Sequence, residues 1–353
     1  VHIMYLNTNG SVKSTVVINS STSNGPTLSG GDKFGSSATN IGDLDNDGVN
    51  DLAVGAPFDN TGGDRRGALH IMYLNTNGSV KSTVEINSST SNGPTLSDID
   101  LFSLGGLTAI GDLDNDGVND LAVGALHDDE GGDGRGAVHM MFMNTNGSVK
   151  STVEINSSTS NGPTLANGDQ FGMSIANIGD LNNDGVNDLA VGAHGDDTGG
   201  SGNGAVHIVF LEPSTAPSAL FPSSTVEIND TTSNGPVLTN TDQFAGHGFT
   251  NIGDLNNDGV DDLVIGAPLD DAGGTNRGAI HIMFMNTDGS VDSTVEINSQ
   301  TSNGPSGLAD GANFGWDLDN IGDLDNDGVN DLAVSAYHDD HGGTYRGTIQ
   351  IIF

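Results

Sequence analysis

Aspartates recur at alternate positions of a nine-residue segment whose oxygen atoms could bind a divalent cation. In its first copy, residues 43–51 (DLDNDGVND), carboxylates occupy positions 1, 3, 5 and 9, and Gly48 permits a sharp turn at position 6. Val49, at position 7, can add its backbone carbonyl oxygen. Hard oxygen ligands in this number suit Ca²⁺, whereas Mg²⁺ requires a tighter octahedron. The segment is therefore predicted to be a calcium-binding loop.

The loop occurs five times, so we expect about five Ca²⁺ ions, one for each repeat. An EF-hand would carry Glu at position 12, but that position is Val54 in the first copy, which indicates a β-hairpin loop instead. Asn182 and Asn256 replace the position-3 aspartate in the third and fourth copies, and these two loops are predicted to bind calcium more weakly. The predicted ligands are Asp43, Asp45, Asp47, Val49 and Asp51; Asp112, Asp114, Asp116, Val118 and Asp120; Asp180, Asn182, Asp184, Val186 and Asp188; Asp254, Asn256, Asp258, Val260 and Asp262; and Asp323, Asp325, Asp327, Val329 and Asp331.

The composition restricts the partners of the chain. Its 353 residues include 9 Lys and Arg against 47 Asp and Glu, which gives a formal charge of -38. Nucleic acid and anionic membrane surfaces are therefore poor partners. Cysteine is absent, and no apolar run has the length of about 18 residues that a membrane span needs. So strong a charge favours a protein that binds cations.

The calcium loops belong to a longer repeat of about 70 residues. Each repeat contains four short apolar or alternating runs separated by Gly, Asn and Asp, and in the first these are FGSSATNIG, DLAVGAP, GALHIMYLN and STVEIN. Such runs are typical of strands and turns, and no helical period is present. Four strands for each repeat describe one blade of a β-propeller. The sequence predicts an all-β, single-domain propeller over residues 1–353, with five four-stranded blades.

Ring closure is less regular than the repeat itself. The GALHIM-type run occurs six times, and its first copy, Val1 to Leu6, precedes the first full repeat. We expect the STVVIN strand, Ser14 to Asn19, to complete the blade that begins at Phe314. Val1 to Leu6 would then be an additional outer strand or a contact to a neighbouring molecule, because an unpaired strand edge recruits another strand.

The repeats resemble the FG-GAP repeats of the integrin α-subunit propeller and its microbial relatives. The FG element is present as Phe34-Gly35, Phe171-Gly172 and Phe314-Gly315, and the GAP element as Gly55-Ala56-Pro57 and Gly266-Ala267-Pro268. All five calcium loops match the pattern of that family. The resemblance implies an extracellular or cell-surface protein that binds proteins or glycans. It also implies seven blades, so five repeats depart from the usual number.

Two further polar patterns recur in the repeats. His2, His70, His139, His207 and His281 share one strand position, where we expect a packing or solvent-facing role rather than a zinc site. A second acidic turn, HDDEGG at residues 127–132, recurs in other repeats, where a solvated hairpin tip is favoured over a cation site. The chain contains no GxSxG, HExxH or P-loop motif, and the prediction is that it is not an enzyme.

Two functions remain open on this evidence. The near-identity of NTNGSVKSTVEINSSTSNGPTL across repeats favours a structural or adhesion module of a cell surface, appendage or filament, with self-association or a surface or matrix partner. The alternative is a ligand-binding, lectin-like or protein-binding propeller. It draws support from the connection between Leu211 and Thr225, where Leu220 and Phe221 interrupt the repeat. Seven N-x-S/T patterns, at Asn9, Asn19, Asn77, Asn87, Asn146, Asn156 and Asn229, are compatible with export.

Overall fold

Every secondary-structure element of the computed structural model is a β-strand within residues 1–8, 11–212, 222–340, 343 and 346–353, which the structure describes. The Leu220 and Phe221 feature and the sequon at Asn9 lie outside these residues. No helix in the described ranges is long and apolar enough to cross a membrane. The predicted all-β class is therefore confirmed.

The strands form a five-bladed β-propeller, as predicted, and consecutive strands within each blade are antiparallel neighbours. Blade 1 contains β3 (Ala38–Gly42), β4 (Asp51–Ala56), β5 (Ala68–Leu74) and β6 (Val80–Ile86), and blade 2 contains β7 (Leu107–Gly111), β8 (Asp120–Ala125), β9 (Ala137–Met143) and β10 (Val149–Ile155). Blade 3 contains β11 (Phe171–Asn177), β12 (Leu189–Ala193), β13 (Ala205–Leu211) and β14 (Pro222–Ile228), and blade 4 contains β15 (Phe249–Gly253), β16 (Asp262–Ala267), β17 (Ala279–Met285) and β18 (Val291–Ile297). Blade 5 contributes three strands, β19 (Phe314–Gly322), β20 (Asp331–Ala336) and β21 (Thr348–Ile352).

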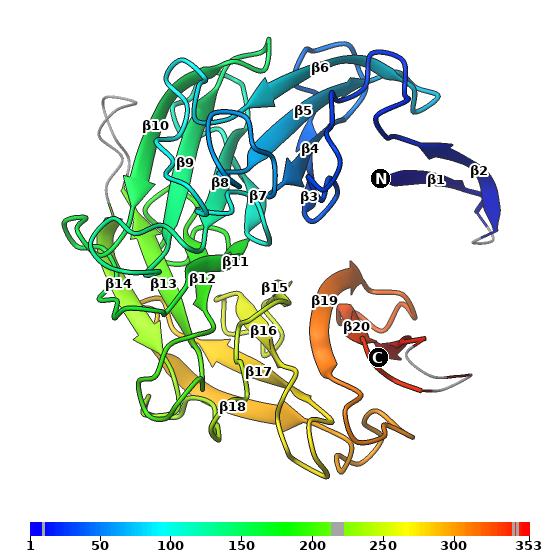
Figure 1. Ribbon diagram of the computed structural model, residues 1–353. Helices are drawn as coiled ribbons and strands as arrows, with labels where there is room; N and C mark the ends of the chain where they lie inside the picture. The colour runs from blue at the N-terminus through cyan, green and yellow to red at the C-terminus, as the bar shows by residue number, and fades with distance from the viewer. Residues whose placement is uncertain (9–10, 213–221, 341–342, 344–345) are drawn as a thin grey trace.

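The N-terminal hairpin corrects the expected closure of the ring. β2 (Val12–Val17) pairs with β1 (His2–Leu6) in a separate two-stranded sheet, and not with β21. Their register, His2 opposite Val17, repeats that of β5 and β6 in blade 1, where His70 lies opposite Glu85. Only five residues separate β1 from β2, so pairing between them costs less loop-closure entropy than pairing of β2 with the fifth blade, which is distant in the sequence. Figure 1 shows the hairpin and blade 5 at the two ends of the ring.

The second and third strands of blade 2, β8 and β9, are buried on both faces. All seven residues of β9 are buried, as are all six of β8, because neighbouring blades cover both sides of each sheet. This explains why these strands read as nearly continuous apolar runs. In the outer strand β10, only the first and last residues are buried, and the residues between them are half-buried.

The FG and GAP elements meet across adjacent blades. A Cβ atom on Gly124, in the GAP position of blade 2, would collide with the backbone carbonyl of Gly172, in the FG position of blade 3. Gly55, Gly192 and Gly266 make the equivalent close approaches to the FG residue of the following blade. Glycine is therefore required where two backbones come together. In blade 5 the position is Ser335, whose Oγ accepts a 2.9 Å hydrogen bond from the backbone N–H of Asp317.

The most repetitive segment of the sequence joins blades at their outer edges. Thr83 on β6 donates to the carbonyl of Asn24, in the connection that leads into blade 1, at 2.8 Å. Thr152, Thr225 and Thr294 make the same bond in blades 2 to 4. Tyr73 donates to the carbonyl of Thr145 in the next blade at 3.0 Å. Interlocking of successive copies thus gives a structural reason for the near-identity of this segment.

Candidate metal centres

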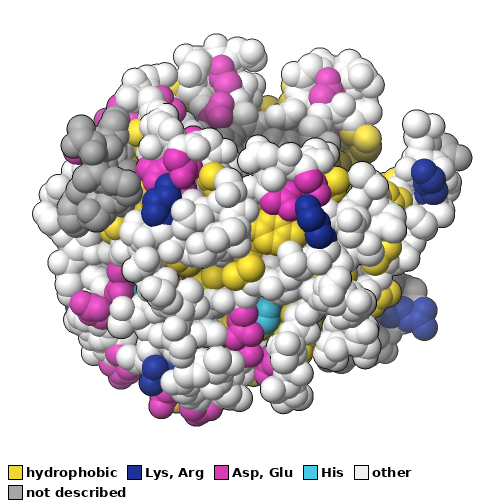
Figure 2. Space-filling view, turned by 90° about the horizontal axis from the view of Figure 1, so that it is seen from above, with side chains coloured by type: hydrophobic (Ala, Val, Ile, Leu, Met, Phe, Trp, Pro, Cys, Tyr) yellow, Lys and Arg dark blue, Asp and Glu magenta, His cyan; other side chains and the backbone are white. Residues whose placement is uncertain are grey.

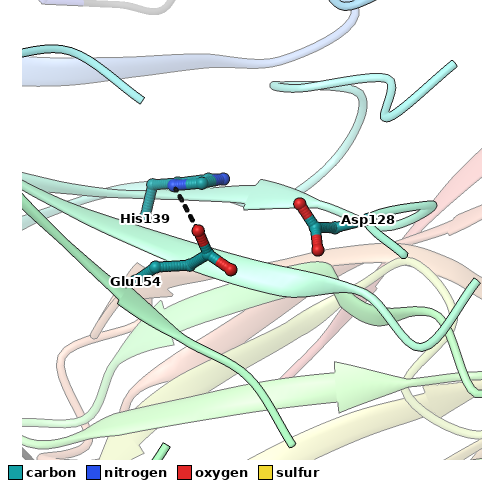
Figure 3. Close-up of side chains that lie close together, drawn as sticks. All are labelled: Asp128, His139 and Glu154. Carbon is teal, nitrogen blue, oxygen red and sulfur yellow. Dashed lines mark ion pairs between the residues drawn. The ribbon is translucent and has the colours of Figure 1, made fainter. Parts of the chain in front are cut away.

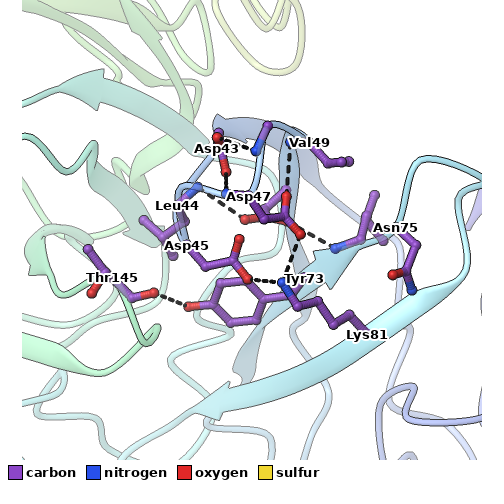
Figure 4. Close-up of polar contacts among 12 residues, drawn as sticks. Asp43, Leu44, Asp45, Asp47, Val49, Tyr73, Asn75, Lys81 and Thr145 are labelled. Carbon is purple, nitrogen blue, oxygen red and sulfur yellow. Dashed lines mark hydrogen bonds and ion pairs between the residues drawn. The ribbon is translucent and has the colours of Figure 1, made fainter.

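The five acidic loops connect the first and second strands of the five blades, where their backbones curl around the first aspartate. In blade 1, the two carboxylate oxygens of Asp43 accept hydrogen bonds from the N–H groups of Asp47 and Gly48, both at 2.8 Å (Figure 4). Asp47 in turn accepts from the N–H of Val49 at 3.0 Å. Gly48 has a φ of 89°, which favours glycine at the turn. Position 1 accepts the same pair of bonds in every loop.

The aspartate at position 9 attaches each loop to the blade. Asp51 is fully buried and accepts from the N–H groups of Leu44, at 3.1 Å, and Leu74, at 2.9 Å. Its counterparts Asp120, Asp188 and Asp262 make both bonds, and Asp331 makes the first of them. Burial raises the pKa of Asp120 to about 7. An unneutralised carboxylate is therefore costly at this position, which a bound cation would offset.

Carboxylates at positions 1, 3 and 9 come together in three loops. One ligand oxygen from each of Asp43, Asp45 and Asp51 lies within 4.8 Å of the others. The same holds for the loops of blades 2 and 5. The valines at position 7 of the first four loops pack against the hydrophobic core, which fixes the backbone that carries the proposed carbonyl ligand. Val329, in the fifth loop, is 39% exposed.

A lysine faces two of the loops, a feature that sequence reasoning missed. The Lys81 ammonium lies 2.5 Å from a carboxylate oxygen of Asp45 and 2.7 Å from one of Asp47 (Figure 4). Lys150 makes the equivalent pair of contacts in blade 2. Figure 2 shows acidic side chains in separate groups over one face of the molecule, some of them beside a Lys or Arg side chain. These ammonium groups occupy positions that a calcium ion would compete for.

The asparagine loops lack this lysine. The strand position of Lys81 is Ser223 in blade 3 and Asp292 in blade 4. There, the amide of Asn182 donates to Asp184 at 3.1 Å, and that of Asn256 donates to Asp258 at 2.8 Å. The four aspartates and one lysine of a lysine-bearing loop carry a net charge of -3, the same as the three aspartates of the blade 3 loop, and Asp292 brings the blade 4 group to -4. The loss of lysine therefore opposes the predicted weakening of calcium binding in these two loops.

Position 8 ties the loops to the preceding blade, which was also not foreseen. The amide of Asn119 donates to the carbonyl of Ile41 at 3.1 Å. Asn187 and Asn330 make the equivalent bonds at 3.0 and 2.8 Å, and Asp261 instead accepts from Asn251 at 2.8 Å. A cation that orders the loop would also order the contact between blades.

The acidic loops lie at the end of the blades opposite to a central cavity of about 750 Å³. Every blade contributes to its lining, through Ser37, Leu104, Met173, His247 and Trp316. These residues stand before the first strand or within its first three residues, whereas the acidic loop follows that strand. Trp316 stacks between His247, with ring centroids 3.9 Å apart, and Tyr337, at 4.9 Å.

The repeated histidines pack in the core instead of facing solvent in blades 1 to 4. His139 is fully buried and meets the ring of Phe102 edge-on, with centroids 5.6 Å apart. Burial lowers the pKa of His139 to about 4, so the ring is neutral. The second acidic turn is not a solvated tip throughout, because its first aspartate, Asp128, is only 5% exposed.

We expect Asp47→Ala and Asp116→Ala each to remove one calcium ion and to lower the free energy of unfolding by about 1–3 kcal/mol. Asp184→Ala should cost less if ligand charge controls affinity, because position 3 of that loop is already Asn182. Calcium stoichiometry and denaturant unfolding in excess calcium measure both effects. Asp133→Ala, an exposed acid outside the loops, is the control. Equal losses in all three loop variants would show that the missing lysine compensates for the missing carboxylate.

Comparison with known proteins agrees with this architecture. The FG-GAP repeat model matches residues 34–72, 171–209 and 250–283. The chain is 28% identical to integrin alpha pat-2 of Caenorhabditis elegans over 247 residues, which cover 66% of this chain and 18% of that protein. It is 33% identical to integrin alpha-4 of Xenopus laevis over 171 residues (46% and 15%), and 38% identical to integrin alpha-11 of Homo sapiens over 168 residues (47% and 13%). The chain thus spans less than a fifth of these relatives.

Proposed function

We propose that this FG-GAP repeat propeller, which resembles the propeller of the integrin α-subunit, is a calcium-stabilised, non-catalytic adhesion module that acts outside the cell or at its surface. The observation that carries the proposal is the separation of two faces. The five acidic loops, which we propose to bind cations, lie at one end of the blades, and the opposite end presents a cavity to which every blade contributes. Such a division leaves the cavity face and the edges of the ring available for contact.

An extracellular location is supported by the chemistry of the loops. Calcium sites of the weaker, extracellular class are occupied at millimolar calcium and would be empty at cytosolic concentrations. The sequons add less than their number indicates, because Asn87, Asn156 and Asn229 are buried. The amide of Asn156, for example, donates to Glu154 at 2.5 Å. Asn19, Asn77 and Asn146 are exposed and remain candidates for glycosylation.

Strand edges at the two ends of the ring favour contact with a second copy of the chain. β21 has no outer neighbour among the described strands, and Ile349 and Phe353 are 70% and 71% exposed. β1 pairs on one side only, and Met4 and Leu6 are 60% and 61% exposed. Unpaired backbone groups beside exposed apolar side chains recruit another strand. The proposed occupant of each edge is a strand from a second copy.

A bead-aggregation assay tests adhesion directly. Beads coated with the 353-residue chain should cluster in millimolar calcium and disperse on chelation, because the proposed calcium ions would stabilise the blades that carry the contact edges. Ile349→Lys should reduce clustering severalfold, because an edge lysine opposes strand pairing. Val237→Lys, at a 79% exposed position outside the strands, is the matched control. Beads that stay dispersed at every calcium concentration, with soluble chain monomeric in sedimentation, would contradict self-adhesion.

The ligand-binding alternative is favoured by the aromatic stack in the cavity. Trp316 presents a flat ring between His247 and Tyr337, next to Lys33 and Asp317. Aromatic faces with a few polar groups around them suit a ligand that is part apolar and part hydroxylated, such as a sugar ring. Saturable binding on a glycan array that Trp316→Ala abolishes, without bead clustering, would favour this function over self-adhesion.

A further inference from the structure

Four blades bury a histidine whose two ring nitrogens have no hydrogen-bond partner. These residues occupy the third position of the third strand and are all fully buried: His70, His139, His207 and His281. A buried polar group without a partner is costly, and such groups usually mark a site that something else completes. Their edge-on contacts with phenylalanine rings satisfy neither nitrogen.

Carboxylates lie close to the ring in blades 2 and 3. In blade 2, Glu154 on β10 lies opposite His139 on β9 in the strand register, and Asp128 comes from the turn after β8. One ligand atom from each of the three residues lies within 4.8 Å of the others (Figure 3). Asp196, His207 and Glu227 form the same cluster in blade 3. Blades 1 and 4 carry the same three residue types at these positions, namely Asp59, His70 and Glu85, and Asp270, His281 and Glu296.

In blade 2, the two carboxylates of the cluster each accept a hydrogen bond that holds one oxygen in place. One oxygen of Glu154 accepts from the amide of Asn156, and the other lies 4.0 Å from Nδ1 of His139. One oxygen of Asp128 accepts from the N–H of Glu130 at 2.8 Å. Outer hydrogen bonds of this kind orient the ligands of metal centres.

A fourth carboxylate lies beside the cluster. Asp100 is 1% exposed, and its Oδ2 accepts from the N–H of Ser97 at 2.5 Å, while its Oδ1 is buried without a partner. The negative charge of Asp100 lies close enough to Glu154 to repel the charge of that carboxylate. The equivalent aspartates, also buried, are Asp32, Asp169 and Asp242.

Blade 5 shows that these residues are lost together. The position of the histidine is Gln350, and the position of Asp100 is Ala312. The remaining aspartate, Asp339, accepts a hydrogen bond from the hydroxyl of Thr348 at 2.8 Å. A histidine needed only for core packing gives no reason for the simultaneous loss of a buried aspartate from a different segment.

We propose that blades 1 to 4 each contain a second metal site, distinct from the calcium loops, in which the buried histidine and its carboxylates bind a divalent first-row transition ion, with Zn²⁺ as the best fit. Imidazole nitrogen suits Zn²⁺ and its neighbours, whereas Ca²⁺ takes oxygen ligands. One nitrogen and three carboxylate oxygens complete a tetrahedral set. Two ligands of a tetrahedral zinc lie about 3.3 Å apart, so the 4.0 Å pair must close by less than about 1 Å.

The two kinds of site lie at opposite ends of the blades. Asp128 follows the second strand, His139 lies near the start of the third and Glu154 near the end of the fourth, which places the cluster toward the cavity end. The calcium loop lies between the first and second strands, at the other end. A transition ion would therefore strengthen the half of each blade that calcium does not reach.

Cobalt counting in excess calcium tests the proposal, with Co²⁺ as the spectroscopic probe for a zinc site. The chain is stripped with a chelator, returned to millimolar calcium to fill the loops, and dialysed against micromolar Co²⁺. We expect about four bound Co²⁺ ions by elemental analysis, with the visible absorption of nitrogen-ligated, low-coordinate cobalt. His139→Gln, which reproduces the residue of blade 5, should remove one ion.

Three variants make the outcome decisive. Glu154→Gln, at a partly exposed side chain, should also remove one ion if His139→Gln fails to fold. His127→Gln, a half-buried histidine outside the clusters, and Asp47→Ala, in a calcium loop, should leave the cobalt count unchanged. Absence of bound cobalt in calcium, displacement of cobalt by millimolar calcium, or a count unaffected by both His139→Gln and Glu154→Gln would overturn the proposal.

Discussion

Removal of calcium should lower the melting temperature of this propeller by about 10 °C or more, and calcium should restore it better than magnesium. A site held at tenfold excess over its Kd stabilises the folded state by about 1.4 kcal/mol, so five sites contribute roughly 7 kcal/mol. This is comparable with the whole stability of a typical domain. Differential scanning calorimetry with and without chelator, followed by addition of each ion alone, measures the effect.

The structure supplies the physical reason for so large an effect. In the loops of blades 1, 2 and 5 the carboxylates at positions 1, 3 and 9 come together, and in all five loops the aspartate at position 9 is buried. Five bound Ca²⁺ ions would change the formal charge from -38 to -28, by adding five charges of +2. Lys81 and Lys150 offset part of the repulsion in two loops. A chelated sample that melts within a degree or two of the calcium form would show that the loops are stable without the ion.

Much of the fold could be predicted because the repeat shows its strands and turns directly. Turn residues separate the runs, and the aspartates of each loop fall at positions that only a tight hairpin brings together. The error at the N-terminus arose because strand counting cannot rank two partners for β2. β2 pairs with β1 because only five residues separate the two strands and because Val1 exchanges backbone hydrogen bonds with Ile18, at 3.0 and 2.9 Å.

The second cluster was missed for a different reason. A single histidine in an apolar strand predicts burial or exposure equally well. The histidines of different blades are too far apart to share one zinc ion, and ligands from the same blade were not considered. The partners of His139 lie within its own blade, on a neighbouring strand and in a turn. Two signals could have found them: the hairpin register, which places Glu154 opposite His139, and the joint change to Ala312 and Gln350 in blade 5. The contacts of Lys81 and Lys150 with the loops could not be predicted, because they depend on the twist of the blade, which the sequence does not show.

Gly124→Ala should lower the free energy of unfolding by about 3 kcal/mol, at the upper end of the range for overpacking. The new methyl group would meet the backbone carbonyl of Gly172 in the next blade, and a backbone atom cannot move aside as the end of a side chain can. Because the backbone at Gly124 is not in the left-handed region, the cost measures packing between blades and not conformational strain. Denaturant unfolding in saturating calcium gives the value.

Two substitutions separate this packing cost from the general effect of replacing glycine. Gly30→Ala places a methyl group in open space, at a residue that also lacks a left-handed backbone, and should leave stability unchanged or raise it slightly. Ser335→Ala occupies the GAP position of blade 5, which already accepts a side chain, and should cost much less than Gly124→Ala. If Gly124→Ala were as mild as Gly30→Ala, the blades would not be in backbone contact, and the FG and GAP elements would need another explanation.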